Sequence, residues 1–290
     1  MFLRNLFPFF AMLFLVNCST QADSTVFIMV HGTWGADSSW YQPEGDFFRA
    51  LEQSAKMRGA QVVSFQWNGR NKHSRRKKAA LQLDKLILSY PIDTTINLVA
   101  HSHGTNVVNL LSQLLDEHGE NHHLINAVYA FGTPVDAGCY RPNMRNIKYF
   151  YHFFSFNDFV QPVLGMFNRE YPGIDRIVNI RTMINGAEPT HTGFLSPLIA
   201  EWIPAIHFEL FAKRLGNFRS FTFNEPGVIN FELNGPPTYE IDYKRARLLE
   251  IDHTRCMAIR SATLRGQINR QKEYALMGSI HGLPPHFMAR

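Results

Sequence analysis

The serine at position 102 stands where the local pattern changes from a strand to a helix. An apolar run with the length of a strand ends at Ala100, and apolar residues at helical spacing begin after Gly104. A serine at such a sharp corner has its hydroxyl held out from the backbone, which is the geometry of a nucleophile elbow. The residues two positions before and after it must be small, and here they are Ala100 and Gly104. The alternative is that Ser102 caps an ordinary helix.

A serine nucleophile needs two partners. Its hydroxyl is weakly nucleophilic at neutral pH, so a histidine must take its proton and a carboxylate must hold that histidine in the correct tautomer. Three aspartates follow Ser102 at suitable positions, namely Asp136, Asp158 and Asp175. We prefer Asp158 because it comes just after an aromatic strand predicted over 146–156, where loops are expected to face the site. The alternative for Asp158 is a turn-capping role.

Several histidines after Ser102 are candidates for the general base. His191, the first of them, lies in the loop after a strand predicted over 177–184. His207 is the second choice because it sits inside a helical pattern, which favours a structural role. If neither serves, His253 or His281 would have to reach back from the C-terminal segment.

Acyl transfer also needs hydrogen-bond donors for the negative oxygen of the tetrahedral intermediate, and losing one such donor costs about 10²- to 10³-fold in rate. We expect the backbone N–H of His103, directly after the serine, to be one donor. The backbone N–H of Thr33, which follows a histidine–glycine pair at the end of the first predicted strand, is expected to be the other. His31 and His101 are predicted to be structural.

The elements that position these residues alternate between strand and helix. Predicted strands cover 25–30, 61–67, 97–100, 125–131, 146–156 and 177–184. Predicted helices cover 46–58, the segment from 70 to Pro91, the region after Gly104 through 115, and 201–215. This alternation predicts an α/β fold with a doubly wound, mainly parallel sheet.

The character of the chain changes near Asn217. Short strands are predicted within 221–223, 228–233 and 239–243, followed by a helical piece over 252–274. We therefore expect an N-terminal signal over 1–22, a catalytic domain over 23–216 and a C-terminal α+β extension over 217–290, for which the sequence indicates no role.

The N-terminus has the features of an export signal. Arg4 precedes an uncharged apolar stretch over 6–16, which is too short for an ordinary membrane span. Two processing sites compete: lipidation of Cys18, with membrane anchoring, or cleavage before Asp23. An uncleaved anchor is the third alternative. We expect an exported protein that is periplasmic, membrane-anchored or secreted.

Much of the net charge of +5 comes from one segment of the chain. Six basic residues fall within 70–78, and a solvated helix face is the preferred interpretation. The alternatives are contact with anionic lipid headgroups or with a phosphorylated polymer. Nucleic-acid binding is disfavoured because no aromatic residues are interleaved with the charges.

The sequence gives little support for a metal site or a disulfide. The 290 residues include three cysteines, and none has metal-ligand spacing. Cys139 and Cys256 either pair or remain two separate thiols. His118, His122 and His123 share one loop, but no carboxylate spacing accompanies them, so solvated histidines are preferred to a metal site.

Four motifs together resemble α/β-hydrolases of the bacterial lipase and serine-esterase type. They are the segments 30–33, 100–104, 131–134 and 158–162, and the resemblance covers about 25–215. The alanine at position 100 departs from the usual G-x-S-x-G pattern. The resemblance implies hydrolysis of a carboxylic ester, of a small molecule or a lipid, through a Ser-Asp-His triad and an acyl-enzyme, without a cofactor. It also places the base in the loop of His191, and we therefore predict that His191 is the general base. A catalytically silent binding protein at the cell surface and an acyltransferase with the same triad are the alternatives.

Overall fold

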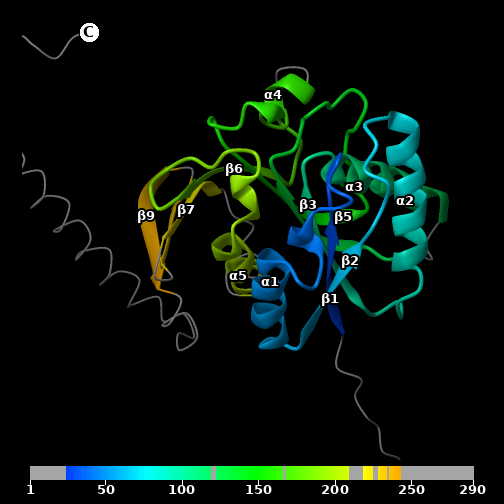
Figure 1. Cartoon of the computed structure of the whole chain (residues 1–290), viewed down its shortest axis with the longest axis horizontal. Helices are drawn as coiled ribbons and strands as arrows, with labels where there is room; N and C mark the ends of the chain where they lie inside the picture. The colour runs from blue at the N-terminus through cyan, green and yellow to red at the C-terminus, as the bar shows by residue number, and fades with distance from the viewer. Residues whose placement is uncertain are drawn as a thin grey trace, which may run out of the picture.

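A computed structural model describes residues 24–118, 122–165, 168–208, 218–224, 228–233 and 235–242. Its strands form one sheet in the order β2-β1-β3-β4-β5-β6-β7-β8-β9, and helices cover both faces (Figure 1). Strands β1 to β7 pair with one another in parallel, whereas β8 is antiparallel to both β7 and β9. The predicted doubly wound, mainly parallel α/β sheet is confirmed.

The strands are β1 (Thr25–Val30), β2 (Ala60–Phe65), β3 (Thr95–His101), β4 (Ile125–Phe131), β5 (Ile147–Phe154), β6 (Ile177–Ile184), β7 (Phe218–Asn224), β8 (Val228–Leu233) and β9 (Gly235–Asp242). The α-helices are α1 (Asp46–Lys56), α2 (His73–Ile87), α3 (His103–Leu114), α4 (Val160–Leu164) and α5 (Pro197–Ile206). Short 3-10 turns are η1 (Ser39–Tyr41), η2 (Leu115–His118) and η3 (Gly193–Leu195).

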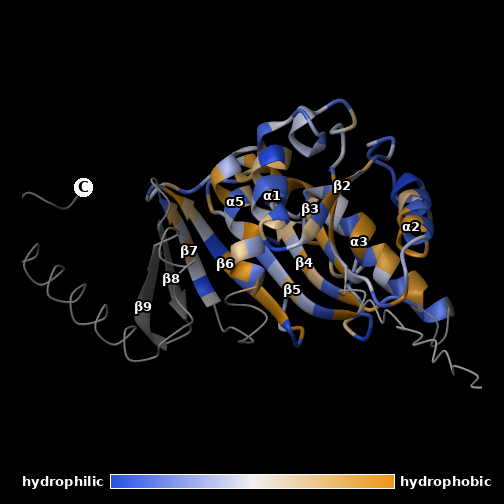
Figure 2. Cartoon of the chain, turned by 90° about the horizontal axis from the view of Figure 1, so that it is seen from below, coloured by the Kyte–Doolittle hydropathy of each residue, from blue (hydrophilic) through white to orange (hydrophobic). Residues whose placement is uncertain are grey.

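Side chains alternate across the sheet and build two cores. In β1, Phe27 and Met29 pack into the core under α1 and α5, whereas Ile28 and Val30 pack into the core under α2 and α3. This is the period-two alternation of a strand buried on both faces. Figure 2 shows the sheet passing between these two helix pairs. Because apolar layers fix both faces, the ends of the strands are rigid supports for the loops that follow them.

The sheet does not end at β6. Strand β7 pairs in parallel with β6, with Thr182 opposite Phe221, and β8 and β9 extend the same sheet. Phe221 is fully buried and belongs to the core under α1 and α5. The expected boundary between 216 and 217 therefore lies between two adjacent strands of one sheet. The helical piece expected over 252–274 lies outside the described residues.

The predicted N-terminal signal over 1–22, including Cys18, also lies outside the described residues. Within the part of the chain that the structure describes, none of the helices is long and apolar enough to cross a bilayer.

Candidate active site

Ser102 lies at the corner between β3 and α3, as the pattern predicts. Its backbone has φ 55° and ψ −133°, a conformation that residues with a side chain rarely adopt and that costs about 1–3 kcal/mol. The serine occupies the N-cap position of α3, yet its hydroxyl makes no capping hydrogen bond. The helix-cap alternative therefore does not explain this serine, and the strained backbone leaves its Oγ available.

Close packing explains why small residues flank the corner. A Cβ on Gly104 would come within 2.3 Å of the Val30 carbonyl oxygen, so α3 approaches the end of β1 too closely for any side chain there. Ala100 is fully buried in the core beneath α2 and α3, where its methyl group is accommodated. The alanine variant of the motif is thus compatible with the corner, whereas the glycine after the serine is required.

Asp158 and His191 form a hydrogen-bonded pair. His191 Nδ1 lies 2.8 Å from Asp158 Oδ2, and the Asp158 side chain is completely buried. A carboxylate only accepts hydrogen bonds, so His191 donates through Nδ1 and keeps a lone pair on Nε2. The other oxygen, Asp158 Oδ1, accepts the backbone N–H groups of Val160 and Gln161. One oxygen of the Asp158 carboxylate therefore caps the turn, as the alternative has it, and the other holds the His191 ring.

Gly132 brings this pair to the elbow. The Ser102 N–H donates to the carbonyl of Phe131, so the corner after β3 adjoins the residue that follows β4. Gly132 has φ +58°, and a Cβ there would lie 3.1 Å from Asp158 Oδ2 and 3.3 Å from His191 Nδ1. The missing side chain leaves the space in which the aspartate–histidine pair sits. No hydrogen bond joins Ser102 to His191 among the described residues, and such contacts are often long before substrate binds.

Two backbone N–H groups border the serine. Gly32 packs on the elbow so tightly that a Cβ would lie 2.8 Å from Ser102 Cβ, which places Thr33 beside the serine. His103 is the first residue of α3, where helix geometry leaves N–H groups without intrahelical partners. Within the described residues neither the Thr33 nor the His103 N–H is engaged by a hydrogen bond. Both N–H groups are therefore free to donate a hydrogen bond near the serine.

Both histidines that flank Ser102 in sequence are buried and neutral. Burial lowers the pKa of His101 to about 3, and the neighbouring His191 lowers it in the same direction. Burial also lowers the pKa of His103 to about 3, with Arg76 and His191 adding to the effect. His101 donates from Nε2 to the His191 carbonyl at 2.8 Å, and the two rings lie 4.6 Å apart. His101 is thus structural, as predicted, but the structure it supports is the His191 loop.

Three residues that hold the Asp158 loop were not identified from the sequence. Gln161 donates its side-chain N–H to the Thr133 carbonyl beyond β4. Arg169 donates to the carbonyls of Ser155 and Asp158. Glu188, from the loop that carries His191, accepts N–H groups of Phe156 and Asn157 and pairs with Arg181. The only sequence signal was the position of Gln161 within the 158–162 motif.

The remaining candidates lie elsewhere. Asp136 accepts the backbone N–H groups of Gly138 and Cys139 in its own turn, and Asp175 is exposed just before β6. His207 is buried, with Nδ1 against the Tyr129 hydroxyl and Nε2 against Asn126. His253 and His281 lie outside the described residues.

No cluster of metal-ligating side chains occurs in the described part of the chain. His123 contacts the Tyr90 carbonyl and His122 contacts the Asn146 side chain. Cys139 is an exposed free thiol, whereas its possible partner Cys256 lies outside the described residues.

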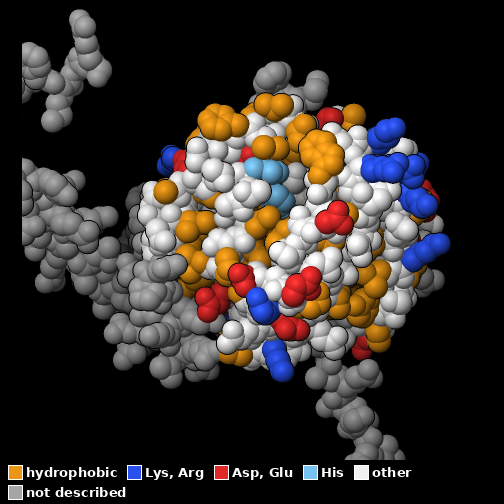
Figure 3. Space-filling view, viewed as in Figure 1, with side chains coloured by type: hydrophobic (Ala, Val, Ile, Leu, Met, Phe, Trp, Pro, Cys, Tyr) orange, Lys and Arg blue, Asp and Glu red, His pale blue; other side chains and the backbone are white. Residues whose placement is uncertain are grey.

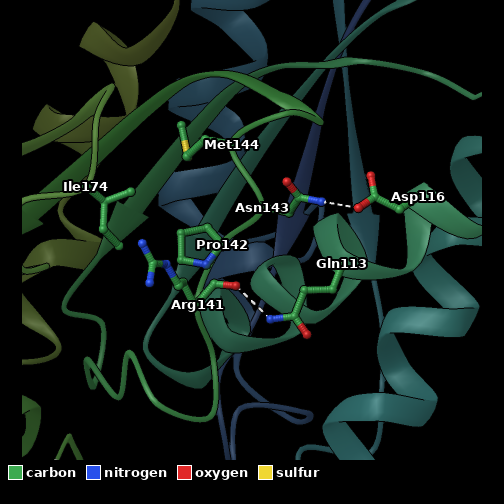
Figure 4. A pocket seen from close by; sticks show the side chains of 7 residues that line it. All are labelled: Gln113, Asp116, Arg141, Pro142, Asn143, Met144 and Ile174. Carbon is green, nitrogen blue, oxygen red and sulfur yellow. Dashed lines mark hydrogen bonds between the residues drawn. The ribbon is translucent and has the colours of Figure 1, made fainter.

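A surface cavity of about 420 Å³ lies away from these residues (Figure 4). Its lining residues are Gln113, Asp116, Arg141, Pro142, Asn143, Met144 and Ile174. Gln113 is near the C-terminal end of α3, roughly 16 Å along the helix from Ser102 at 1.5 Å per residue. This cavity is therefore separate from the elbow.

The comparisons with known proteins give structural neighbours only. No family model and no curated protein matches the sequence. The solved structures that match include a metagenomic carboxyl esterase (12% identity, 56% of this chain and 50% of that one, TM-score 0.34) and Aspergillus fumigatus lipase B (13%, 66% and 53%, TM-score 0.44). A cutinase-like protein from Cryptococcus sp. matches at 14% identity over 66% of this chain and 95% of that one, with a TM-score of 0.41. The chain spans about half the length of the first two proteins.

The fold follows from the chain's own architecture. Strands β1 to β7 form a parallel sheet with helix pairs on both faces, and a strained serine marks the turn from a central strand into a helix. Loops from the ends of β1, β4, β5 and β6 converge on that serine. The chain has an α/β-hydrolase fold.

Proposed function

We propose that this protein is a serine hydrolase that cleaves carboxylic esters, of a small molecule or a lipid, through Ser102, Asp158 and His191. The observation that carries the proposal is the Asp158–His191 hydrogen bond, held against Gly132 beside the strained Ser102. A nucleophile, a base in the required tautomer and a buried carboxylate are what acyl transfer needs.

The chemistry divides into two half-reactions. His191 Nε2 takes the proton of Ser102 Oγ as this oxygen attacks the ester carbonyl carbon, and the N–H groups of Thr33 and His103 stabilise the resulting oxyanion. His191 then gives its proton to the departing alcohol as the C–O bond of the ester breaks, which leaves an acyl group on Ser102. A water molecule, deprotonated by His191, releases the acid and restores the serine.

Covalent labelling tests the nucleophile. A fluorophosphonate probe should label the protein at Ser102, because only an activated serine reacts quickly with such a probe. Labelling should disappear in Ser102→Ala and persist in Ser74→Ala, which removes an exposed serine hydroxyl on α2. Peptide mapping of the label to a serine other than Ser102 would reject the assignment.

The two alternatives are separated by the products. A catalytically silent binding protein would leave both the probe and short-chain aryl esters unreacted. An acyltransferase would react with both, but would deliver the acyl group to an added alcohol in preference to water. A hydrolase would still release free acid as its main product when the alcohol is present.

Export with lipidation at Cys18, or with cleavage before Asp23, stays a proposal that rests on the sequence alone. Mass spectrometry of the protein from its native cell fraction identifies the mature N-terminus. A lipid-modified Cys18 would support the anchor, and retention of Met1 in a soluble, cytoplasmic protein would reject export.

A further inference from the structure

The end of the molecule that carries Ser102 exposes large apolar side chains. Trp34 is 75% exposed and directly follows Thr33, while Phe159 is 70% exposed and directly follows Asp158. With Phe156 and Val163 they form what we call the apolar rim. Figure 3 shows hydrophobic side chains around the histidine atoms that reach the surface near the top of that view. Several of the exposed large apolar side chains of the described residues therefore lie beside the candidate site.

Trp34 is held in its exposed position by an unusual backbone. Its φ is +59°, which is rare for a bulky residue. The conformation is fixed by a hydrogen bond of 2.7 Å from the Trp34 N–H to the carbonyl of Gly69, itself at φ +62°. A strained residue whose ring remains in solvent gains little packing in return, so the strain points to a functional role.

The same hydrogen bond connects the apolar rim to the basic segment. Gly69 directly precedes Arg70, and no acidic residue occurs between Trp67 and Leu83. The exposed members, which we call the basic face, are Arg70, Lys72, Lys77 and Lys78. Figure 3 shows lysine and arginine side chains gathered over α2, next to the apolar rim.

Helix stability does not account for these charges. Positive charge near the N-terminus of a helix opposes the helix dipole, and α2 begins without a side-chain cap. Arg76, a further member of the segment, is instead buried and donates to Tyr140 and Asn71. The basic face therefore does not stabilise the start of α2. It lies next to the apolar rim.

We propose that the apolar rim and the basic face together dock the catalytic end of this protein onto a membrane surface that carries anionic phospholipids. Tryptophan and phenylalanine side chains enter the boundary between headgroups and acyl chains, and lysine and arginine side chains bind the anionic headgroups beside them. A phosphorylated polymer in solution would engage the basic face but would leave the apolar rim exposed, so the lipid surface is favoured. Docking in this way turns Ser102 toward the lipid.

Trp34 supplies a direct probe of docking. The chain has four tryptophans, and the other three, Trp40, Trp67 and Trp202, are buried. The full chain with Ser102→Ala is mixed with phosphatidylcholine vesicles or with vesicles that also contain phosphatidylglycerol, so that hydrolysis does not alter the lipid. We expect the emission to shift to the blue and to be quenched by brominated acyl chains only with the anionic vesicles. Trp34→Phe in the same background should abolish both signals.

Matched variants test each half of the surface. Lys77→Gln with Lys78→Gln should weaken binding to anionic vesicles about 30-fold. Lys56→Gln with Lys85→Gln removes the same charge at the C-terminal ends of α1 and α2 and should change binding little. Val163→Ser should reduce the Trp34 signal, whereas Ile92→Ser, at an equally exposed apolar residue before β3, should not. With Ser102 intact, the Lys77/Lys78 variant should hydrolyse a water-soluble ester normally.

Three results would overturn the proposal. The first is a Trp34 emission that is unchanged and unquenched with anionic vesicles, even when the protein sediments with them. The second is equal loss of binding in the two charge variants, which would indicate a bulk-charge effect. The third is tight binding of soluble polyphosphate together with no vesicle-dependent signal, which would assign the basic face to a polyanion. Each result is independent of whether Ser102 is labelled by a fluorophosphonate.

Discussion

His191 and His207 are buried to different degrees at opposite ends of the same sheet. His191 Nδ1 meets the Asp158 carboxylate next to Gly132, just beyond the C-terminal end of β4, and 16% of its side chain is exposed. His207 is 4% exposed and contacts Asn126 near the N-terminal end of β4.

Their surroundings make them chemically different. The Asp158 carboxylate stabilises a positive charge on the His191 ring when that ring accepts a proton. Around His207, burial lowers the pKa to about 4, and Lys148 acts in the same direction, so this ring stays neutral. Its neighbours are aromatic, with the ring of Phe27 at 5.8 Å and that of Phe208 at 5.0 Å. A carboxylate partner and access to the surface distinguish a candidate base from a core histidine, and the residue type alone does not.

The largest expected effect is the loss of activity in His191→Ala. We expect kcat for a short-chain aryl ester to fall by about 10⁶-fold, close to the loss in Ser102→Ala, because triad members act as a unit. The double variant should be scarcely slower than either single one. If the kcat of His191→Ala stays within tenfold of wild type, another residue is the base. His191 and His207 would then not differ in catalytic role.

Asp158→Asn should follow, with a loss of about 10⁴-fold in kcat. An amide can donate a hydrogen bond to Nδ1 and so hold the His191 ring in the wrong tautomer. The thermal midpoint distinguishes this effect from unfolding, since Asp158 Oδ1 also caps the turn at Val160 and Gln161. A folded Asp158→Asn protein with normal kcat would show that the carboxylate only caps the turn.

His207→Ala should act on stability. Removing a ring packed against Phe27 and Phe208 leaves a cavity, and we expect the free energy of unfolding in urea to fall by about 2–5 kcal/mol. The kcat of the folded protein should stay within about twofold of wild type. Glu52→Ala, at an exposed position on α1, is the control and should change stability by about 0.5 kcal/mol or less.

Acidification should destabilise the protein through its buried histidines. The folded-state pKa is lowered to about 3 for His101 and His103 and to about 4 for His152 and His207, each with burial as the largest cause. Between these values and the ordinary histidine pKa of 6.5, the unfolded chain binds protons that the folded protein does not, so stability falls as the pH falls through this range. Each group contributes up to about 1.4 kcal/mol per pH unit. Urea unfolding at pH 5 and pH 6 measures how steeply the free energy of unfolding depends on pH. His207→Phe should lower this dependence by the contribution of about one proton.

Local patterns predicted the elements well. Strands β4 and β6 begin and end where the sequence indicated, and Ser102 lies at the predicted corner. These features depend on side-chain period and on the steric demands of a few neighbouring residues, which a short stretch of sequence records. The start of α2 was predicted at 70 but lies at His73, and the strand predicted over 146–156 is shorter at both ends.

The sequence by itself determined the α/β class, the elbow and a short set of acids and histidines. The tertiary structure decided which of them meet, because Gly132, Asp158 and His191 come together only once β4, β5 and β6 lie side by side. It also placed β7 next to β6, across a boundary that composition had suggested near Asn217. Strand neighbours and loop contacts depend on packing between distant segments, so no local pattern records that His101 and Glu188 support the candidate site. For the same reason only the folded chain shows Trp34 bonded to Gly69 beside the basic face.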